Sequence, residues 1–361
     1  MSNLRSVPER NRMAERERMG QEQAPAQQYA MVLAAGRGER MVPLTDHLPK
    51  PLLPIANRPV MAYILEHLAR HGFTDVLANV FYRAQEIADY FGDGSCCGVR
   101  LTYAYEEQLW GSAGSVKRNE SFFRGERFLV IGADDLTDMD LTELIHRHTL
   151  AGALATIGLA EVEETSQFGI VVTDEAGRIE RFVEKPAGPA PSNTANTQIY
   201  LFEPRIHSFI PESEWYDFGF GVFPELVSRG EPFYGFALPG YWRDIGSLDD
   251  YLQAQWDVME GAVRASIPGE QREPGIWIGT GAEIHRSARI AAPAVIGEGC
   301  RIGDGAEVGG ATAIADGVEV PVGASLWNCV LWDGAKVEPG QRLSGAVVGR
   351  DGVIVARKGE T

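Results

Sequence analysis

Glycines and cations that could hold a chain of phosphates follow the first apolar stretch of the sequence. Residues 29–35 are apolar throughout, as in a strand covered on both faces, and the chain continues as Gly-Arg-Gly at 36–38. Glycines let backbone N–H groups approach a ligand closely, and a ring of such groups cradles an anion. With Arg40 and the proline-flanked Lys50, this loop suits a triphosphate. An ordinary strand-to-loop turn would explain Gly-x-Gly alone.

A second apolar run, at 128–133, ends in the acids Asp134 and Asp135. Carboxylates at the end of a strand can hold a hard cation such as Mg²⁺ through their oxygens. A capping or purely structural pair of acids is the alternative.

The motifs around these residues resemble a known signature. The sequence reads Leu-Ala-Ala-Gly-Arg-Gly-Glu-Arg-Met-Val-Pro-Leu-Thr at 33–45 and Pro-Lys-Pro-Leu-Leu-Pro at 49–54. It lacks the third glycine of the dinucleotide fingerprint and the Gly-Lys-Ser/Thr of the P-loop. It resembles the sugar nucleotidylyltransferases, the NDP-sugar pyrophosphorylases, over roughly residues 29–260. The resemblance implies an enzyme that takes an NTP and a sugar 1-phosphate to an NDP-sugar and pyrophosphate.

The resemblance also implies how the nucleotide is bound. The segment Gly111-Ser112-Ala-Gly114 resembles the family loop that packs against the base, and Glu106 occupies the position that reads the base edge. A carboxylate can accept two hydrogen bonds from guanine but one from uracil or thymine, which favours GTP. Glu106 could instead be a surface acid. The predicted nucleotide-binding residues are Leu33, Ala34, Ala35, Gly36, Arg37, Gly38, Glu106, Gly111, Ser112 and Gly114.

On the sugar side, the family resemblance assigns Glu184 to a hydroxyl and Lys185 to the phosphate, with Gly169 and Asn196 beside them. A carboxylate suits vicinal hydroxyls and an ammonium suits a phosphate, whereas an ion pair at a hairpin end is the alternative. Gln198 stands where the family has glycine, which leaves the identity of the sugar open.

The segment Trp242-Arg-Asp244-Ile-Gly resembles the family motif that supplies a second metal carboxylate. Asp134 and Asp244 are therefore the predicted Mg²⁺ ligands, since two carboxylates plus phosphate oxygens make a usual magnesium site. The predicted catalytic residues are Arg40, Lys50, Asp134, Lys185 and Asp244.

The elements that must position these residues alternate between strand and helix. Strands are expected at 75–81 and 99–106, a helix at 85–91, and a helix capped by Asn57 up to Gly72. Such alternation predicts a Rossmann-like α/β nucleotidyltransferase domain with a mixed, mostly parallel sheet, whose ligands sit at the carboxyl ends of the strands.

A repeat follows this domain. Aliphatic residues recur every six positions from Ile278 to Leu326, and the pattern resumes at Leu331 after a one-residue slip. This is the hexapeptide pattern of a left-handed parallel β-helix. The predicted organisation is a disordered or weakly helical tail at 1–28, a catalytic domain at 29–261, a linker at 262–275 and the β-helix at 276–355.

Composition limits the class of protein. The net charge of −17 argues against nucleic-acid binding, and no apolar run could span a membrane. The four cysteines show no framework spacing, which predicts a reducing, cytoplasmic location.

GTP with mannose 1-phosphate is the preferred substrate pair, on Glu106 and on the β-helix fused to some guanylyltransferases of the family. Glucose 1-phosphate with dTTP, UTP or ATP stays open, as does a catalytically weak regulatory subunit that binds nucleotide sugar. An acyltransferase role for the β-helix is disfavoured: such helices usually carry a catalytic histidine and act as trimers, whereas here His285 is the only histidine and there is no extended loop. A homo-oligomer assembled through the β-helix is expected.

Overall fold

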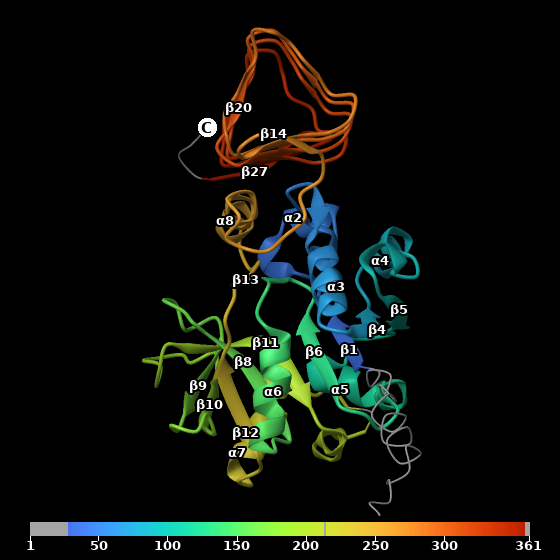
Figure 1. The fold of residues 1–361 in the computed structure, drawn as a ribbon, viewed down its shortest axis with the longest axis vertical. Helices are drawn as coiled ribbons and strands as arrows, with labels where there is room; N and C mark the ends of the chain where they lie inside the picture. Colours follow the sequence, from blue (N-terminus) through green and yellow to red (C-terminus); the bar gives the residue numbers. More distant parts are fainter. Residues whose placement is uncertain (1–27, 213, 358–361) are drawn as a thin grey trace, which may run out of the picture.

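The computed structural model describes residues 28–212 and 214–357. All but the last residue of the tail predicted at 1–28 lies outside these ranges. An α/β unit and a triangular coil of short strands are stacked along the long axis of the molecule (Figure 1). Within the described ranges, no helix has the length and apolar character needed to cross a bilayer.

A nine-stranded mixed sheet forms the centre of the α/β unit. Its strands are β1 (Gln28–Leu33), β4 (Phe73–Val80), β5 (Arg100–Tyr105), β6 (Phe128–Gly132), β8 (Ala155–Glu161), β9 (Gly169–Thr173), β10 (Ile179–Glu184), β11 (Thr194–Phe202) and β12 (Phe233–Ala237). The main order is β10-β9-β11-β6-β1-β4-β5, with β8 beside β11 and β12 beside β8. The run β6-β1-β4-β5 is parallel, whereas β11 is antiparallel to its neighbours. The glycine loop and Asp134 follow adjacent parallel strands and so meet at one edge.

Helices and turns connect these strands and cover both faces of the sheet. Ala30 and Val32 of β1 belong to one hydrophobic cluster, and Tyr29 and Met31 belong to another, as the alternation of side chains along a strand requires. The helices are α2 (Leu44–His47), α3 (Val60–Arg70), α4 (Ala84–Phe91), α5 (Gly111–Arg118), α6 (Leu141–Ala151), α7 (Phe223–Ser228) and α8 (Leu248–Met259). Shorter helical turns are η1 (Glu39–Met41), η2 (Lys50–Leu52), η3 (Ser95–Cys97), η4 (Glu120–Phe123), η5 (Pro204–Phe209) and the π-helical η6 (Phe218–Val222).

The prediction that Asn57 caps a helix is wrong. Strands β2 (Pro54–Ile55) and β3 (Arg58–Pro59) form a hairpin, and Asn57 lies in its turn with φ of 62°. Helix α3 begins only at Val60, without a side-chain cap. The Asn57 amide instead donates to the carbonyl of Ile314, 2.6 Å away in the C-terminal coil. Pairing of the two short strands places this asparagine in a tight turn, where its side chain faces the coil.

The C-terminal coil consists of three sheets whose strands follow one another in rotation. Ile276 pairs with Ala294 and Ala294 with Thr312, so each pairing advances 18 residues; the later pairing of Ala313 with Val330 advances 17. The three sheets form the sides of a triangle (Figure 1). The strands are β14 (Glu270–Glu273), β15 (Ile276–Ile278), β16 (Glu283–Ile284), β17 (Arg289–Ile290), β18 (Ala294–Ile296), β19 (Arg301–Ile302), β20 (Glu307–Gly309), β21 (Thr312–Ile314), β22 (Glu319–Val320), β23 (Ser325–Trp327), β24 (Val330–Leu331), β25 (Arg342–Ser344), β26 (Ala346–Gly349) and β27 (Gly352–Ala356).

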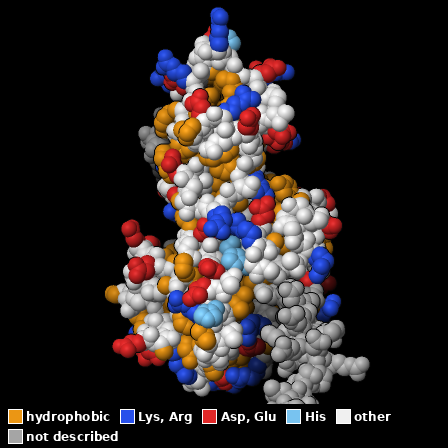
Figure 2. Space-filling model, in the orientation of Figure 1, with side chains coloured by type: hydrophobic (Ala, Val, Ile, Leu, Met, Phe, Trp, Pro, Cys, Tyr) orange, Lys and Arg blue, Asp and Glu red, His pale blue; other side chains and the backbone are white. Residues whose placement is uncertain are grey.

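Small and aliphatic side chains fill the interior of the coil. Cys300, Ala306 and Ala324 are fully buried there, which gives Cys300 a packing role that needs no chemistry. One side of the triangle, which carries β14 and β27, faces α2 and α8 of the α/β unit (Figure 1). On the face drawn in Figure 2, acidic and basic side chains are interspersed over both parts of the molecule.

Candidate active site

The glycine loop takes its shape from a close approach to its own support. Gly38 has φ of 66°, and a Cβ atom there would lie 2.7 Å from Cγ2 of Thr45. The Thr45 hydroxyl donates to the Gly38 carbonyl at 3.0 Å. At the start of the loop, the Ala34 amide donates to Oδ1 of Asn79 at 3.0 Å. The backbone is thereby fixed with its glycines facing a cavity.

This first cavity has a volume of about 500 Å³ and gathers much of the predicted nucleotide and catalytic set. Of the predicted residues, its walls include Leu33, Ala34, Gly36, Arg37, Gly38, Arg40, Lys50, Asp134 and Lys185. Ala35 does not line this cavity, although it lies in the same loop.

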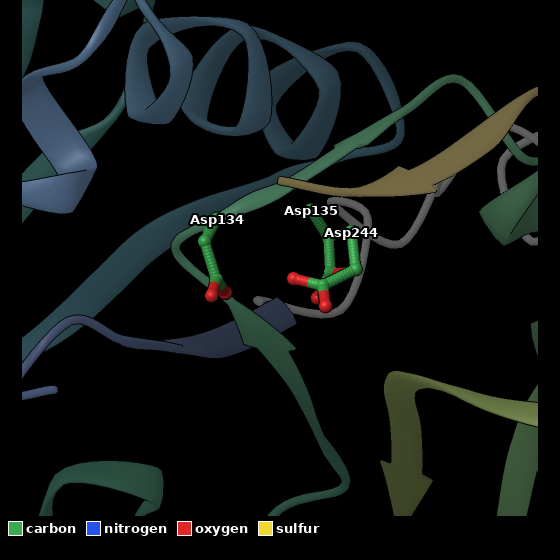
Figure 3. Close-up of side chains that lie close together, drawn as sticks. All are labelled: Asp134, Asp135 and Asp244. Carbon is green, nitrogen blue, oxygen red and sulfur yellow. The ribbon is translucent and has the colours of Figure 1, made fainter. Parts of the chain in front are cut away.

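Three carboxylates converge beside this cavity. Asp134 follows β6, Asp135 begins β7 (Asp135–Thr137), and Asp244 ends β13 (Trp242–Asp244). The strands β7 and β13 are antiparallel, with Asp244 directly opposite Asp135. One carboxylate oxygen from each acid lies within 4.8 Å of the others. The three side chains extend toward a common space (Figure 3).

Two cations compensate this negative charge. Lys50 Nζ contacts Asp134 and lies 3.3 Å from Oδ1 of Asp244, while Arg40 Nη2 lies 3.2 Å from Oδ2 of Asp244. Burial lowers the pKa of Lys50, but attraction to Asp134 and Asp244 outweighs burial, so the net shift is upward. Lys50 is therefore a charged ammonium held between two acids.

Asp135 is the most confined of the three acids. It is fully buried, and its Oδ1 accepts from Trp242 Nε1 at 3.1 Å. Its Oδ2 has no hydrogen-bond partner among the described residues. Burial, and then the charges of Asp134 and Asp244, raise the pKa of Asp135 well above its ordinary value. An uncompensated buried carboxyl oxygen next to two carboxylates fits a hard cation with oxygen ligands.

A second cavity, of about 200 Å³, adjoins the first. Leu33, Arg40 and Lys185 line both cavities. The predicted sugar residues Gly169, Glu184, Lys185 and Asn196 line the second one, together with Gln198, Tyr200 and Asp217. The structure thus brings together the predicted sugar-phosphate set.

Glu184 is held tightly in this second cavity. A Cβ atom would lie 2.4 Å from its Oε2 if added to Gly219, and 2.7 Å from the same oxygen if added to Gly169. Burial raises the pKa of Glu184, Asp217 raises it further, and Lys185 opposes the shift. Lys185 is about half exposed, with its Nζ 3.9 Å from Glu184 Oε1. Its ammonium remains available to an incoming phosphate.

Gln198 occupies a position that favours glycine. Its φ is 57°, where β11 bulges between its pairings at Asn196 and Tyr200. The Asn196 side chain stabilises this bulge, since its Oδ1 accepts from the Gln198 amide and its Nδ2 donates to the Tyr200 hydroxyl, both at 2.9 Å. Gln198 therefore carries a side chain at a position whose backbone conformation favours glycine.

Besides Ala35, four predicted nucleotide residues lie outside the wall of the first cavity: Glu106, Gly111, Ser112 and Gly114. Glu106 Oε1 accepts from Asn79 Nδ2 at 2.9 Å and from the Ser115 hydroxyl, while its Oε2 is buried without a partner among the described residues. Gly111 and Gly114 pack under the backbone of residues 214–216. Ser112, which lines the second cavity, donates to Asp217 Oδ2 at 2.7 Å.

The sequence reasoning missed Asn79 and Asp217, and it gave Asp135 only a supporting part. Asn79 links the glycine loop to Glu106, and Asp217 caps η6 by accepting from the amides of Gly219 and Phe220. The segment Asp-Phe-Gly at 217–219 carried a signal, because Asp is a favoured N-cap residue and Gly219 permits close approach to Glu184.

The fold and the site define an α/β protein with a glycine loop, two cations and a carboxylate cluster gathered at one edge of its sheet. The family model "Nucleotidyl transferase" matches residues 29–261, and the chain belongs to this family, among the sugar-1-phosphate nucleotidyltransferases. It is 38% identical to a UTP–glucose-1-phosphate uridylyltransferase of Synechocystis over 87% of this chain and 85% of that protein. It is 32% identical to a mannose-1-phosphate guanylyltransferase of Mycobacterium tuberculosis over 86% of this chain and 81% of that protein.

Solved structures show the same fold. A putative glucose-1-phosphate thymidylyltransferase from Bacillus anthracis superposes with a TM-score of 0.60 at 24% identity, over 68% of this chain and 98% of that one. A UDP-glucose pyrophosphorylase complexed with UDP-glucose gives 0.56 at 23% identity, over 63% and 97%.

Proposed function

We propose that the enzyme transfers a nucleotidyl group from an NTP to a sugar 1-phosphate at the junction of the two cavities. The observation that carries this proposal is that Arg40 and Lys185 line both cavities. Lys50 and Asp134 line the first cavity, Asp244 lines the second, and Lys50 contacts Asp134. A phosphate oxygen of the sugar substrate attacks the α-phosphorus of the NTP. A new P–O bond forms, the bond from the α-phosphorus to the bridging oxygen breaks, and pyrophosphate leaves with that oxygen.

The chain's own residues align two anions and reduce their repulsion. The glycine loop and Arg40 hold the triphosphate, Lys185 holds the sugar phosphate, and Lys50 offsets charge that develops during transfer. Glu184 and Asn196 hold sugar hydroxyls. No covalent nucleophile is required, because the substrate phosphate supplies the attacking oxygen.

Mg²⁺ is the proposed cofactor, with Asp134 and Asp244 as ligands and Asp135 beside them. The residues present fit this ion, since one carboxylate oxygen from each of the three acids lies within 4.8 Å of the others. In addition, the buried Oδ2 of Asp135 has no hydrogen-bond partner among the described residues. When bound, Mg²⁺ neutralises phosphate charge and polarises phosphoryl oxygens. The contacts of Lys50 with Asp134 and Asp244 hold these two carboxylates near one another.

We infer that UTP with glucose 1-phosphate is the preferred substrate pair. Paired recognition of guanine needs both oxygens of Glu106, but Oε1 already accepts two hydrogen bonds, one from Asn79 and one from Ser115. Its Oε2 is buried, so Glu106 does not offer the two free acceptors on which the preference for guanine depended. The name of the Synechocystis relative supports uridine and glucose. GTP with mannose 1-phosphate is the second candidate, supported by the guanylyltransferase relatives.

The C-terminal coil is, in our proposal, a left-handed β-helix built from hexapeptide repeats. The pairing step of 18 residues equals three repeats of six and supports this assignment. We propose that it joins subunits into a homo-oligomer, because outer strands such as β16 and β17 end the sheets with an open edge.

The test is a matrix of pyrophosphate release over five NTPs and a panel of sugar 1-phosphates, with Mg²⁺ present. The expected maximum is UTP with glucose 1-phosphate. A maximum at GTP with mannose 1-phosphate would refute the inference from Glu106 and keep the reaction class. No release in any combination, from folded protein, would refute the reaction and favour a regulatory subunit.

A further inference from the structure

The hairpin 54–59 lies between Lys50 and the C-terminal coil. Lys50 begins η2, and the hairpin follows within four residues. Its backbone polar groups are bound by side chains from elsewhere: the Ala56 amide donates to Gln255 Oε1 at 2.7 Å, and the Ile55 carbonyl accepts from the Tyr63 hydroxyl at 2.8 Å. Each such bond limits the positions that this segment can take.

A chain of buried hydrogen bonds connects the coil to this hairpin. Trp332 follows β24 in the coil, and its Nε1 donates to the Tyr251 hydroxyl at 3.1 Å. The Tyr251 hydroxyl in turn donates to the Pro54 carbonyl at 2.7 Å. The same carbonyl also accepts from Gln255 Nε2 at 2.8 Å. Trp332 is 8% exposed and Tyr251 is fully buried. Water therefore offers these groups little compensation for a lost bond.

The same face of the coil supports other parts of the active site. One hydrophobic cluster contains Met41 from the nucleotide loop, Leu136 next to Asp135, and Ile245 next to Asp244. It also contains coil residues, among them Val295, Ala313, Val330, Trp332 and Val347. The segments that carry the loop, the acids and Lys50 thus share one core with the coil. A well-packed core transmits small displacements because it lacks free volume.

We propose that the coil is a working part of the active site, in which Trp332 and Tyr251 are positioning residues for Lys50. Docking of the coil sets the hydroxyl of Tyr251, this hydroxyl fixes the Pro54 carbonyl, and the Pro54 segment holds η2 so that Lys50 Nζ lies between Asp134 and Asp244. A change in the coil, such as contact with another subunit, would alter turnover by this route. The proposal rests on the role of Lys50 in the proposed function.

The test is a mutant cycle on the full-length chain, with kcat and both KM values measured for the best substrate pair. Tyr251→Phe removes one oxygen atom and should lower kcat about three- to tenfold, as expected for one buried hydrogen bond, with smaller changes in KM. Trp332→Phe alone should lower kcat relative to the wild type. Combined with Tyr251→Phe, it should lower kcat by less than a further twofold. Trp327→Phe, at an exposed tryptophan of the same coil, is the matched control and should leave kcat unchanged.

The same substitution made in a Lys50→Ala variant distinguishes a positioning effect on Lys50 from a general loss of folded protein. In Lys50→Ala, Tyr251→Phe should change the residual kcat by less than twofold, because the group that it positions is gone. An equal fold loss in both backgrounds, or no loss in the wild-type background, would overturn the positioning role. Wild-type turnover in Lys50→Ala alone would instead refute the proposed part of Lys50 in the reaction, and the positioning role would fall with it.

Discussion

Replacement of Lys50 by methionine separates the electrostatic and catalytic parts of this site. The Nζ of Lys50 lies 3.3 Å from Asp244 Oδ1 and also contacts Asp134. At an effective dielectric constant of about 20, a pair at this distance gains about 5 kcal/mol before desolvation. Methionine keeps much of the volume but leaves three carboxylates without this cation. Breaking a buried pair in this way costs about 3–5 kcal/mol of unfolding free energy.

Thermal unfolding and turnover measure the two parts independently. A loss of about 3 kcal/mol corresponds to a fall in Tm of roughly 4 °C for a chain of 361 residues. Added Mg²⁺ should restore more of the Tm in Lys50→Met than it adds to the wild type, because the ion takes over the role of the missing cation. Turnover should fall roughly 100- to 1000-fold, since a charge that stabilises the transition state is lost.

Lys185→Met is the matched control, because Lys185 lines the same cavity but is about half exposed. Its unfolding free energy should change by no more than about 0.5 kcal/mol. Turnover of Lys50→Met within threefold of the wild type, or a Tm that responds to Mg²⁺ as the wild type does, would refute this account of the cluster.

Gln198→Gly should relieve a residue held at φ of 57° and raise turnover of a 2-acetamido sugar 1-phosphate roughly tenfold relative to the parent hexose, measured as a ratio of kcat/KM. An unchanged ratio would exclude Gln198 as a selectivity residue. Asp217→Ala should lower the free energy of unfolding by about 1 kcal/mol through loss of the η6 cap, and denaturant midpoints equal to the wild type would contradict this. Burial lowers the pKa of His67 to about 4, so the unfolded state binds more protons between pH 6.5 and 4, and stability falls as pH falls through this window. His67→Gln should flatten that fall by on the order of 1–3 kcal/mol, whereas His146→Gln, on an exposed ring, should keep the wild-type slope; equal slopes in all three proteins would refute the assignment.

Much of the α/β framework could be predicted from local pattern. Residues 29–35 and 128–133 are apolar runs of strand length, and the acids and glycines that follow them mark strand ends. Because parallel strands end at one edge, the loop and Asp134 could be placed together before any coordinates were known. The alternation of β1, β4 and β5 with α3 and α4 follows the predicted order.

Contacts between distant segments could not be predicted in this way. The local sequence around Asn57 predicts a helix cap, yet the Asn57 side-chain amide donates to the carbonyl of Ile314, which lies 257 positions further along the chain. Glu106 has the residue type that reads a base, but the Asn79 and Ser115 side chains that occupy one of its oxygens come from other elements. Opposition of Asp135 and Asp244 depends on the register of two short strands, which one sequence does not specify.

Detection of the NDP-sugar itself is the most direct test of nucleotidyl transfer. The wild-type enzyme and the Asp134→Asn variant, each verified as folded, would be incubated with UTP, glucose 1-phosphate and Mg²⁺. The products would be separated, then identified and quantified by mass spectrometry. We expect UDP-glucose and pyrophosphate in equal amounts from the wild type, and a rate at least 100-fold slower from the variant. Equal rates from both proteins would contradict the carboxylate centre, and absence of any NDP-sugar from the wild type across all substrate pairs would contradict nucleotidyl transfer.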